Sequence, residues 1–110
     1  MPILQGPNRV PDVAAYAAWG LAFHAAGEID PIPLHFHDCD EYYFIVEGRL
    51  KVQSEGIEYE MAKGDVLFTR MGDEHAILEV YEDTKLFWLE GPLQGRKRLG
   101  HLFRGIDDVD

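Results

Sequence analysis

Residues 35–48 read HFHDCDEYYFIVEG, and this stretch carries most of the information about the fold. His35 and His37 are two positions apart, a spacing that places both imidazoles on one face of a β-strand. Glu41 follows after a short connection, compatible with a tight hairpin, and it opens a run of aromatic and β-branched residues that favours a second strand. We therefore expect Glu41 to lie beside the two histidines on the adjacent antiparallel strand.

Short strand-like segments divided by turns continue on both sides of this stretch. Pro31 and Pro33 exclude a helix just before it, and Gly48 ends it with a turn. Residues 14–26 combine helix-favouring alanines with apolar residues at strand period, and we interpret them as a strand. Strands are predicted at residues 34–37 and 41–46, and further strands at residues 50–53, 57–61, 66–69, 75–81 and 85–90. This succession of short strands and turns indicates an all-β, antiparallel sandwich or barrel.

His75 begins one of the later strands, and a barrel can bring it opposite the histidine pair. Imidazole nitrogens and carboxylate oxygens bind divalent transition metals at about 2.0–2.2 Å. A barrel interior lined by such groups without an ion would leave costly unsatisfied polar atoms. We predict that His35, His37, Glu41 and His75 hold one divalent metal ion, and ligand type leaves iron, manganese, nickel, zinc and copper open.

Two segments of the chain resemble the two sequence motifs of the cupin superfamily. Residues 35–48 are similar to the first motif, which is His-x-His, three or four residues, Glu, six residues and Gly. Residues 64–75, GDVLFTRMGDEH, are similar to the second, with its two glycines and its histidine at the family spacing. The resemblance covers residues 27–79 and implies a small single-domain cupin, that is, an antiparallel double-stranded β-helix or jelly-roll barrel. The family's metal ligands then match His35, His37, Glu41 and His75.

Three positions depart from the family pattern without removing a ligand. Arg70 stands where cupins usually have proline, and it either meets an anionic substrate or is a surface turn residue. Glu79 replaces the usual asparagine and is in phase with His75 on a straight strand. Glu79 therefore either orients a metal ligand or is a solvated residue at the end of its strand. Ile29 stands where the family has a glycine, six residues before the first histidine, and Gly27 is nearby.

Several residues near the predicted ligands allow two interpretations. Tyr43 shares the face of Glu41 by strand alternation, and it is our candidate catalytic residue, as a hydrogen-bond donor or an acid/base. The alternative is a buried tyrosine that closes the barrel. Cys39 is either a plain turn residue or a redox-sensitive thiol. We interpret His24 and His101 as ordinary surface or core residues, and we assign no residue to an organic cofactor.

The domain prediction is an irregular lead-in at residues 1–12, a barrel at residues 13–92 and a tail of uncertain structure at residues 93–110. The tail begins with a basic run at residues 96–98, which we interpret as solvated. Twenty acidic residues against ten basic ones give a net charge of -10, which disfavours nucleic acid and anionic membranes. With one cysteine and no apolar run long enough to cross a bilayer, we expect a cytoplasmic protein.

Function remains less defined than fold, because cupins carry out many unrelated activities. The leading hypothesis is a metal-dependent enzyme acting on a small polar metabolite, of the isomerase, dioxygenase, decarboxylase or lyase type. The alternative is a non-catalytic module that binds a small ligand or is stabilised by its ion. A sensor domain of a transcription factor is disfavoured by the acidic charge. A domain this small exposes much of its surface, and we expect a homodimer.

Overall fold

A computed structural model of the protein describes residues 8–9, 18–92 and 99–104. These ranges contain the strands β1 (Asn8–Arg9), β2 (Ala18–His24), β3 (Ile29–His35), β4 (Glu41–Glu47), β5 (Arg49–Ser54), β6 (Ile57–Ala62), β7 (Val66–Thr69), β8 (His75–Val80) and β9 (Thr84–Glu90). They form two antiparallel sheets, β1-β2-β9-β4-β7 and β3-β8-β5-β6. The predicted all-β antiparallel architecture is confirmed. Within the same ranges, no helix has the length and apolarity needed to cross a membrane.

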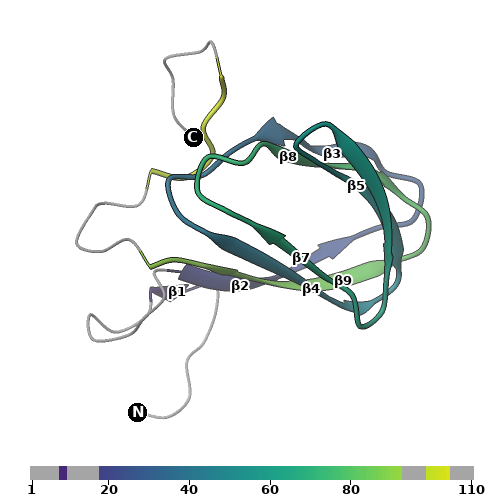
Figure 1. Ribbon diagram of the computed structural model, residues 1–110. Helices are drawn as coiled ribbons and strands as arrows, with labels where there is room; N and C mark the ends of the chain where they lie inside the picture. Colours follow the sequence, from purple (N-terminus) through teal and green to yellow (C-terminus); the bar gives the residue numbers. More distant parts are fainter. Residues whose placement is uncertain (1–7, 10–17, 93–98, 105–110) are drawn as a thin grey trace, which may run out of the picture.

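The two sheets face each other as the walls of a flattened barrel (Figure 1). Apolar side chains from both sheets fill the space between them. Each fully buried aliphatic side chain contributes roughly 1.5–3 kcal/mol relative to an exposed one. The buried core consists of Tyr43, Ile45, Leu50, Val52, Met61, Ile77, Val80 and Leu86.

Strand β4 shows how sequence alternation places the site residues. Glu41, Tyr43 and Ile45 are buried, whereas Tyr42 and Phe44 on the opposite face are only partly buried. The strand lies between β9 and the edge strand β7, so its inward side chains enter the barrel from the larger sheet. This alternation confirms the predicted facing of Glu41 and Tyr43.

Strand β3 begins at Ile29, earlier than the segment predicted at residues 34–37. It pairs with β8 only at intervals, through Ile29 with Glu79, Ile32 with Ile77 and His35 with His75. Pro31 and Pro33 lie in the gaps of this pairing, where their missing N–H groups cost no ladder hydrogen bond. The consequence for the site is that His35 and His75 stand directly opposite each other.

An irregularity in β8 corrects the expectation for Glu79. Val80 pairs with Leu50 and Glu79 with Lys51, but the next partner of β5, Val52, pairs with Ile77. The extra residue makes a bulge that turns Val80 into the core and Glu79 to the outer face beside Lys51. Glu79 therefore lies on the opposite face from His75, because the straight strand assumed from the sequence does not exist. The alternative interpretation, a solvated strand residue, agrees with its partial exposure.

Part of the predicted lead-in and tail is also described. Strand β1 falls within residues 1–12 and pairs with β2. In the tail, Leu102 forms an antiparallel bridge with Phe36, just after β3. The backbone N–H of each residue donates to the carbonyl of the other at 2.9 Å. The basic run at residues 96–98 lies outside the described residues.

Candidate metal centre

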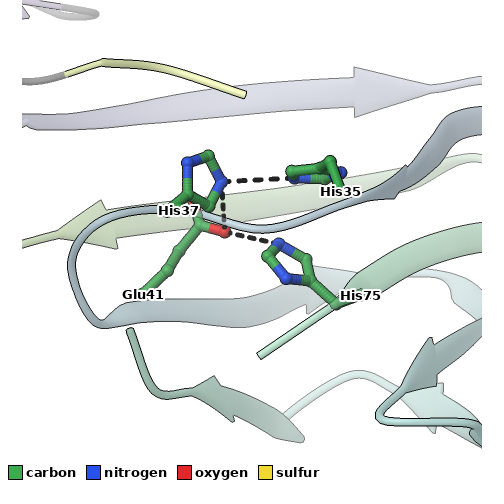
Figure 2. Close-up of side chains that lie close together, drawn as sticks. All are labelled: His35, His37, Glu41 and His75. Atoms are coloured by element: carbon green, nitrogen blue, oxygen red, sulfur yellow. Dashed lines mark hydrogen bonds and ion pairs between the residues drawn. The ribbon is translucent and has the colours of Figure 1, made fainter. Parts of the chain in front are cut away.

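The four predicted ligands converge at one end of the barrel interior. His35 ends β3, Glu41 begins β4 and His75 begins β8, while His37 lies in the connection between β3 and β4. Figure 2 shows their side chains pointing toward one another. Their ligand atoms all lie within 4.8 Å of each other, and the four residues are between 0% and 3% exposed.

The carboxylate of Glu41 contacts two of the three imidazoles. Its Oε1 lies 2.9 Å from Nε2 of His75 and 3.3 Å from Nε2 of His37. The Nε2 atoms of His35 and His37 are 3.2 Å apart. All three imidazoles thus present the same ring nitrogen to a shared centre.

The other nitrogen of each imidazole, Nδ1, contacts a backbone carbonyl. A carbonyl oxygen can only accept, so each Nδ1 carries a proton and donates it. In a neutral imidazole this leaves the lone pair on Nε2, which is the arrangement found in metal-binding histidines. The donor–acceptor pairs are His35 with Pro33 at 2.7 Å, His37 with Gly100 at 3.0 Å and His75 with Asp73 at 3.2 Å.

This donor set fits a divalent transition-metal ion. Three Nε2 lone pairs and a carboxylate facing one another repel unless a cation or a proton lies between them. The contact between His35 and His37 is the clearest case, because both Nδ1 protons are already committed to carbonyls. Imidazole and carboxylate suit iron, manganese, nickel or zinc, and the geometry does not discriminate among them.

The charges of the cluster are distributed unevenly. Burial, with the nearby His75, lowers the pKa of His35 to about 3, so its ring is neutral at physiological pH. Burial also acts to lower the pKa of His37, but the hydrogen bond and charge of Glu41 outweigh it and raise that pKa. Burial would raise the pKa of Glu41, yet hydrogen bonds with His37 and His75 hold it well below its usual value. A proton shared between His37 and Glu41 thus supplies positive charge where an ion would otherwise do so.

Tyr43 lies next to the ligands, as its position after Glu41 predicts. Its ring meets that of His75 edge-on, with centroids 5.7 Å apart. Burial and the negative charges of Glu41 and Glu90 raise the pKa of Tyr43 well above 10. The hydroxyl therefore stays protonated near neutral pH, and it shares a hydrogen bond with Glu41. Of the two roles expected from the sequence, this environment favours hydrogen-bond donation over proton abstraction.

Glu90 belongs to the same cluster, although no motif in the sequence marks it as a candidate. It ends β9, is the direct cross-strand partner of Glu41, and is 2% exposed. Its Oε2 lies 3.7 Å from Nε2 of His37. The signal was present in the strand period, because Glu90 is in phase with the inward residues Thr84 and Leu86. A charged residue at an inward position of a barrel strand is unfavourable unless a polar partner or an ion balances its charge.

The described part of the tail also reaches the cluster. The ring of His101 lies against that of His35, with centroids 4.0 Å apart and planes 31° apart, and its centroid is 5.2 Å from that of His37. The neighbouring Gly100 provides the carbonyl that orients His37. The interpretation of His101 as an ordinary surface or core residue did not predict its contact with the ligand histidines, and no local sequence pattern indicates that contact. His24, by contrast, lies outside the cluster and contacts Glu28 at 3.2 Å.

Two further candidates take simpler positions. Arg70 is exposed in the turn before His75, and its guanidinium lies 3.6 Å from the carboxylate of Asp73. Asp73 also accepts from the backbone N–H of Arg70 at 3.0 Å, so the turn forms without the usual proline. The surface-turn interpretation of Arg70 agrees with this geometry. Cys39 is buried in the connection between β3 and β4, where a thiol is shielded from oxidants.

Comparisons with known proteins agree with the fold. A family model described as the cupin domain matches residues 25–90. The uncharacterised protein y4oW of Sinorhizobium fredii is 44% identical over 69 residues, which are 63% of this chain and 32% of that protein. The chain therefore spans about a third of the length of this curated relative.

Solved structures share the architecture at low sequence identity. The DMSP lyase DddQ of Ruegeria pomeroyi superposes with a TM-score of 0.65 at 23% identity, over 77% of this chain and 43% of that chain. A predicted oxalate decarboxylase of Thermotoga maritima gives 0.64 at 23% identity, over 72% of this chain and 69% of that chain. At these identities the likeness concerns the fold.

Proposed function

Because this chain belongs to the cupin family, we propose that it is a metal-dependent enzyme acting on a small polar metabolite. One observation carries the proposal: three buried imidazoles, each fixed through Nδ1 to a backbone carbonyl, gather their Nε2 atoms and the carboxylate of Glu41 within 4.8 Å of one another. Such fixed ligands are prepared for an ion before it arrives. The reaction type stays within the isomerase, dioxygenase, decarboxylase and lyase classes.

Each residue has a definite part in this proposal. His35, His37, Glu41 and His75 would hold one divalent ion, iron, manganese, nickel or zinc. A bound ion of this kind supplies a Lewis acid that polarises an oxygen of the substrate. Tyr43 would donate a hydrogen bond from its protonated hydroxyl to a substrate oxygen, and the apolar barrel wall would keep water away from the reacting groups.

Deep burial of the ligands supports a second candidate function. All four are at most 3% exposed, and the segment with His101 lies against two of them. An ion enclosed in this way can serve the stability of the fold alone, or the barrel can bind a small ligand without turning it over. The two candidates share the metal site and differ in whether a substrate reaches it.

Metal analysis of the purified protein is the first test. We expect about one divalent ion per chain in the wild type and in a His24→Ala control, which alters a histidine outside the cluster, and none in His37→Ala. Turnover of a metabolite, or oxygen uptake by the iron form, supports the enzyme. A thermal shift with a metabolite and no turnover supports the binding module. If dialysis against each divalent ion leaves no stoichiometric binding, the proposal fails.

We also infer that the chain forms a homodimer in the cytoplasm. An aromatic face on the outer side of β4, β7 and β9 supports the dimer, with the rings of Tyr42 and Phe68 4.9 Å apart and those of Phe44 and Phe87 6.0 Å apart. Phe68 remains 46% exposed in the single chain. Apolar faces of this kind are common in protein–protein interfaces. The cytoplasmic location rests on the single cysteine of the chain.

A further inference from the structure

Glu90 places a second buried carboxylate beside the four ligands. Strands β4 and β9 pair so that Glu41 and Glu90 are directly opposite, and both side chains point into the barrel. The Oε2 of Glu90 faces Nε2 of His37, the nitrogen that points to the shared centre, and not Nδ1, which is bonded to Gly100. The carboxylates of Glu90 and Glu41 are within hydrogen-bonding reach of each other, and a hydrogen bond between them requires a proton on one of the two.

This arrangement is unfavourable unless positive charge is added. Two ionised carboxylates in contact repel strongly in a site from which water is excluded. The imidazole of His37 contacts both carboxylates, with Nε2 3.3 Å from Oε1 of Glu41 and 3.7 Å from Oε2 of Glu90. One protonated imidazole there balances one of the two negative charges. A divalent cation balances both. The pair of glutamates therefore favours a doubly charged ion more than Glu41 alone would.

The second carboxylate also changes the charge of the loaded centre. Three neutral imidazoles and one carboxylate leave a divalent ion with a net charge of +1, which attracts anionic chelating ligands. With Glu90 ionised as well, the net charge falls to zero. The electrostatic attraction for a carboxylate or another anion is then largely lost, whereas a hydroxyl or carbonyl oxygen of an uncharged molecule is still accepted.

We propose that Glu90 is a functional member of the metal centre, where it strengthens binding of the divalent ion and makes the loaded site select uncharged hydroxyl or carbonyl compounds over anions. This inference rests on the proposed metal-dependent function and adds the charge class of the ligand to it. Glu90 acts here as a positioning and specificity-determining residue, through its charge and through its contact with His37.

Titration with cobalt(II) tests the metal part of the proposal. The variants are E90Q, which removes the charge with little change of shape, E90D, which keeps it, and the control E79Q, which removes the same charge from the outer face of β8. We expect E90Q to bind cobalt(II) about tenfold or more weakly than the wild type, and E79Q to bind it equally well. Visible absorption of the bound cobalt provides the isotherm, and circular dichroism confirms folding.

Azide titration of the cobalt-loaded proteins tests the selection against anions. We expect E90Q to bind azide about tenfold more tightly than the wild type, while E79Q and E90D stay close to the wild type. Equal cobalt affinity in E90Q and the wild type would overturn the inference, and so would equal azide affinity. If E90Q does not fold, E90N removes the same charge from a shorter side chain and replaces it in both titrations, with E90D as the charged control, and equal affinities of E90N and E90D would overturn the inference. If the wild type binds no cobalt(II), the proposed function itself fails. If the wild type binds cobalt(II) and E90Q binds it equally well, only the inference about Glu90 fails.

Discussion

Replacement of Gly48 by alanine should lower the free energy of unfolding much more than the same change at Gly56. Gly48 joins β4 to β5 and ends the HFHDCDEYYFIVEG stretch, with a φ of 95°. A Cβ added there would meet the backbone carbonyl oxygen of Asp83 and lie 2.6 Å from Cα of Thr84. Gly56, in the turn between β5 and β6, has a similar φ of 80° but nothing within 4 Å of an added Cβ.

The comparison separates two costs that act together at Gly48. A left-handed backbone conformation costs an alanine roughly 1–2 kcal/mol relative to glycine, and this applies at both positions. The collision with backbone atoms adds about 1–3 kcal/mol at Gly48 alone, because the neighbouring residues Asp83 and Thr84 must move. We therefore expect losses in the free energy of unfolding of about 2–5 kcal/mol for Gly48→Ala and about 1–2 kcal/mol for Gly56→Ala.

Urea denaturation of the metal-free proteins, followed by circular dichroism, measures both losses. Chelator is kept in the buffer so that metal binding does not add to the stability of one variant. The expected difference corresponds to a gap in melting temperature of roughly 5–20 °C for a domain of this size. Equal destabilisation by the two substitutions would refute the close approach of the β4–β5 turn to residues 83–84.

Three further predictions concern the metal centre and the outer face. In metal-free protein, the pKa of His35 is about 3, against an ordinary value of 6.5, so the unfolded chain binds more protons than the folded one between these values. The stability that this provides is complete above pH 6.5 and is lost as the pH falls toward 3. In His35→Gln, the urea midpoint should therefore depend less on pH between 3 and 6.5 than in the wild type. The same pH dependence in both proteins would contradict this prediction. His101→Ala should weaken metal binding by about tenfold in an equilibrium titration, while His24→Ala leaves it unchanged. Equal metal affinities of the two variants would show that the contact of His101 with His35 does not affect metal binding. Phe68→Lys, on the aromatic face, should convert the dimer to monomer in sedimentation equilibrium, and a wild type that already sediments as a monomer would rule the dimer out.

Much of the fold and four members of the site follow from local patterns. His35, His37 and Glu41 lie within seven consecutive residues, so strand alternation and one short connection are enough to bring them together. His75 is distant in sequence, and two further signals include it: its position at the start of a later predicted strand and the resemblance of residues 64–75 to a known motif. The burial of Tyr43 also follows from alternation, because its strand runs without a bulge from Glu41 to Ile45.

Local patterns fail to predict side-chain positions where a bulge changes the register of a strand, or where residues distant in sequence come into contact. The bulge in β8 reverses the facing of Glu79, and its position depends on pairing with β5, which no window around residue 79 contains. Glu90 gains its role from lying opposite Glu41, 49 positions earlier, and Gly100 and His101 gain theirs because the tail folds back to pair at Phe36. Alternation along one strand specifies which face a side chain occupies, whereas the partner on that face depends on how all the strands assemble.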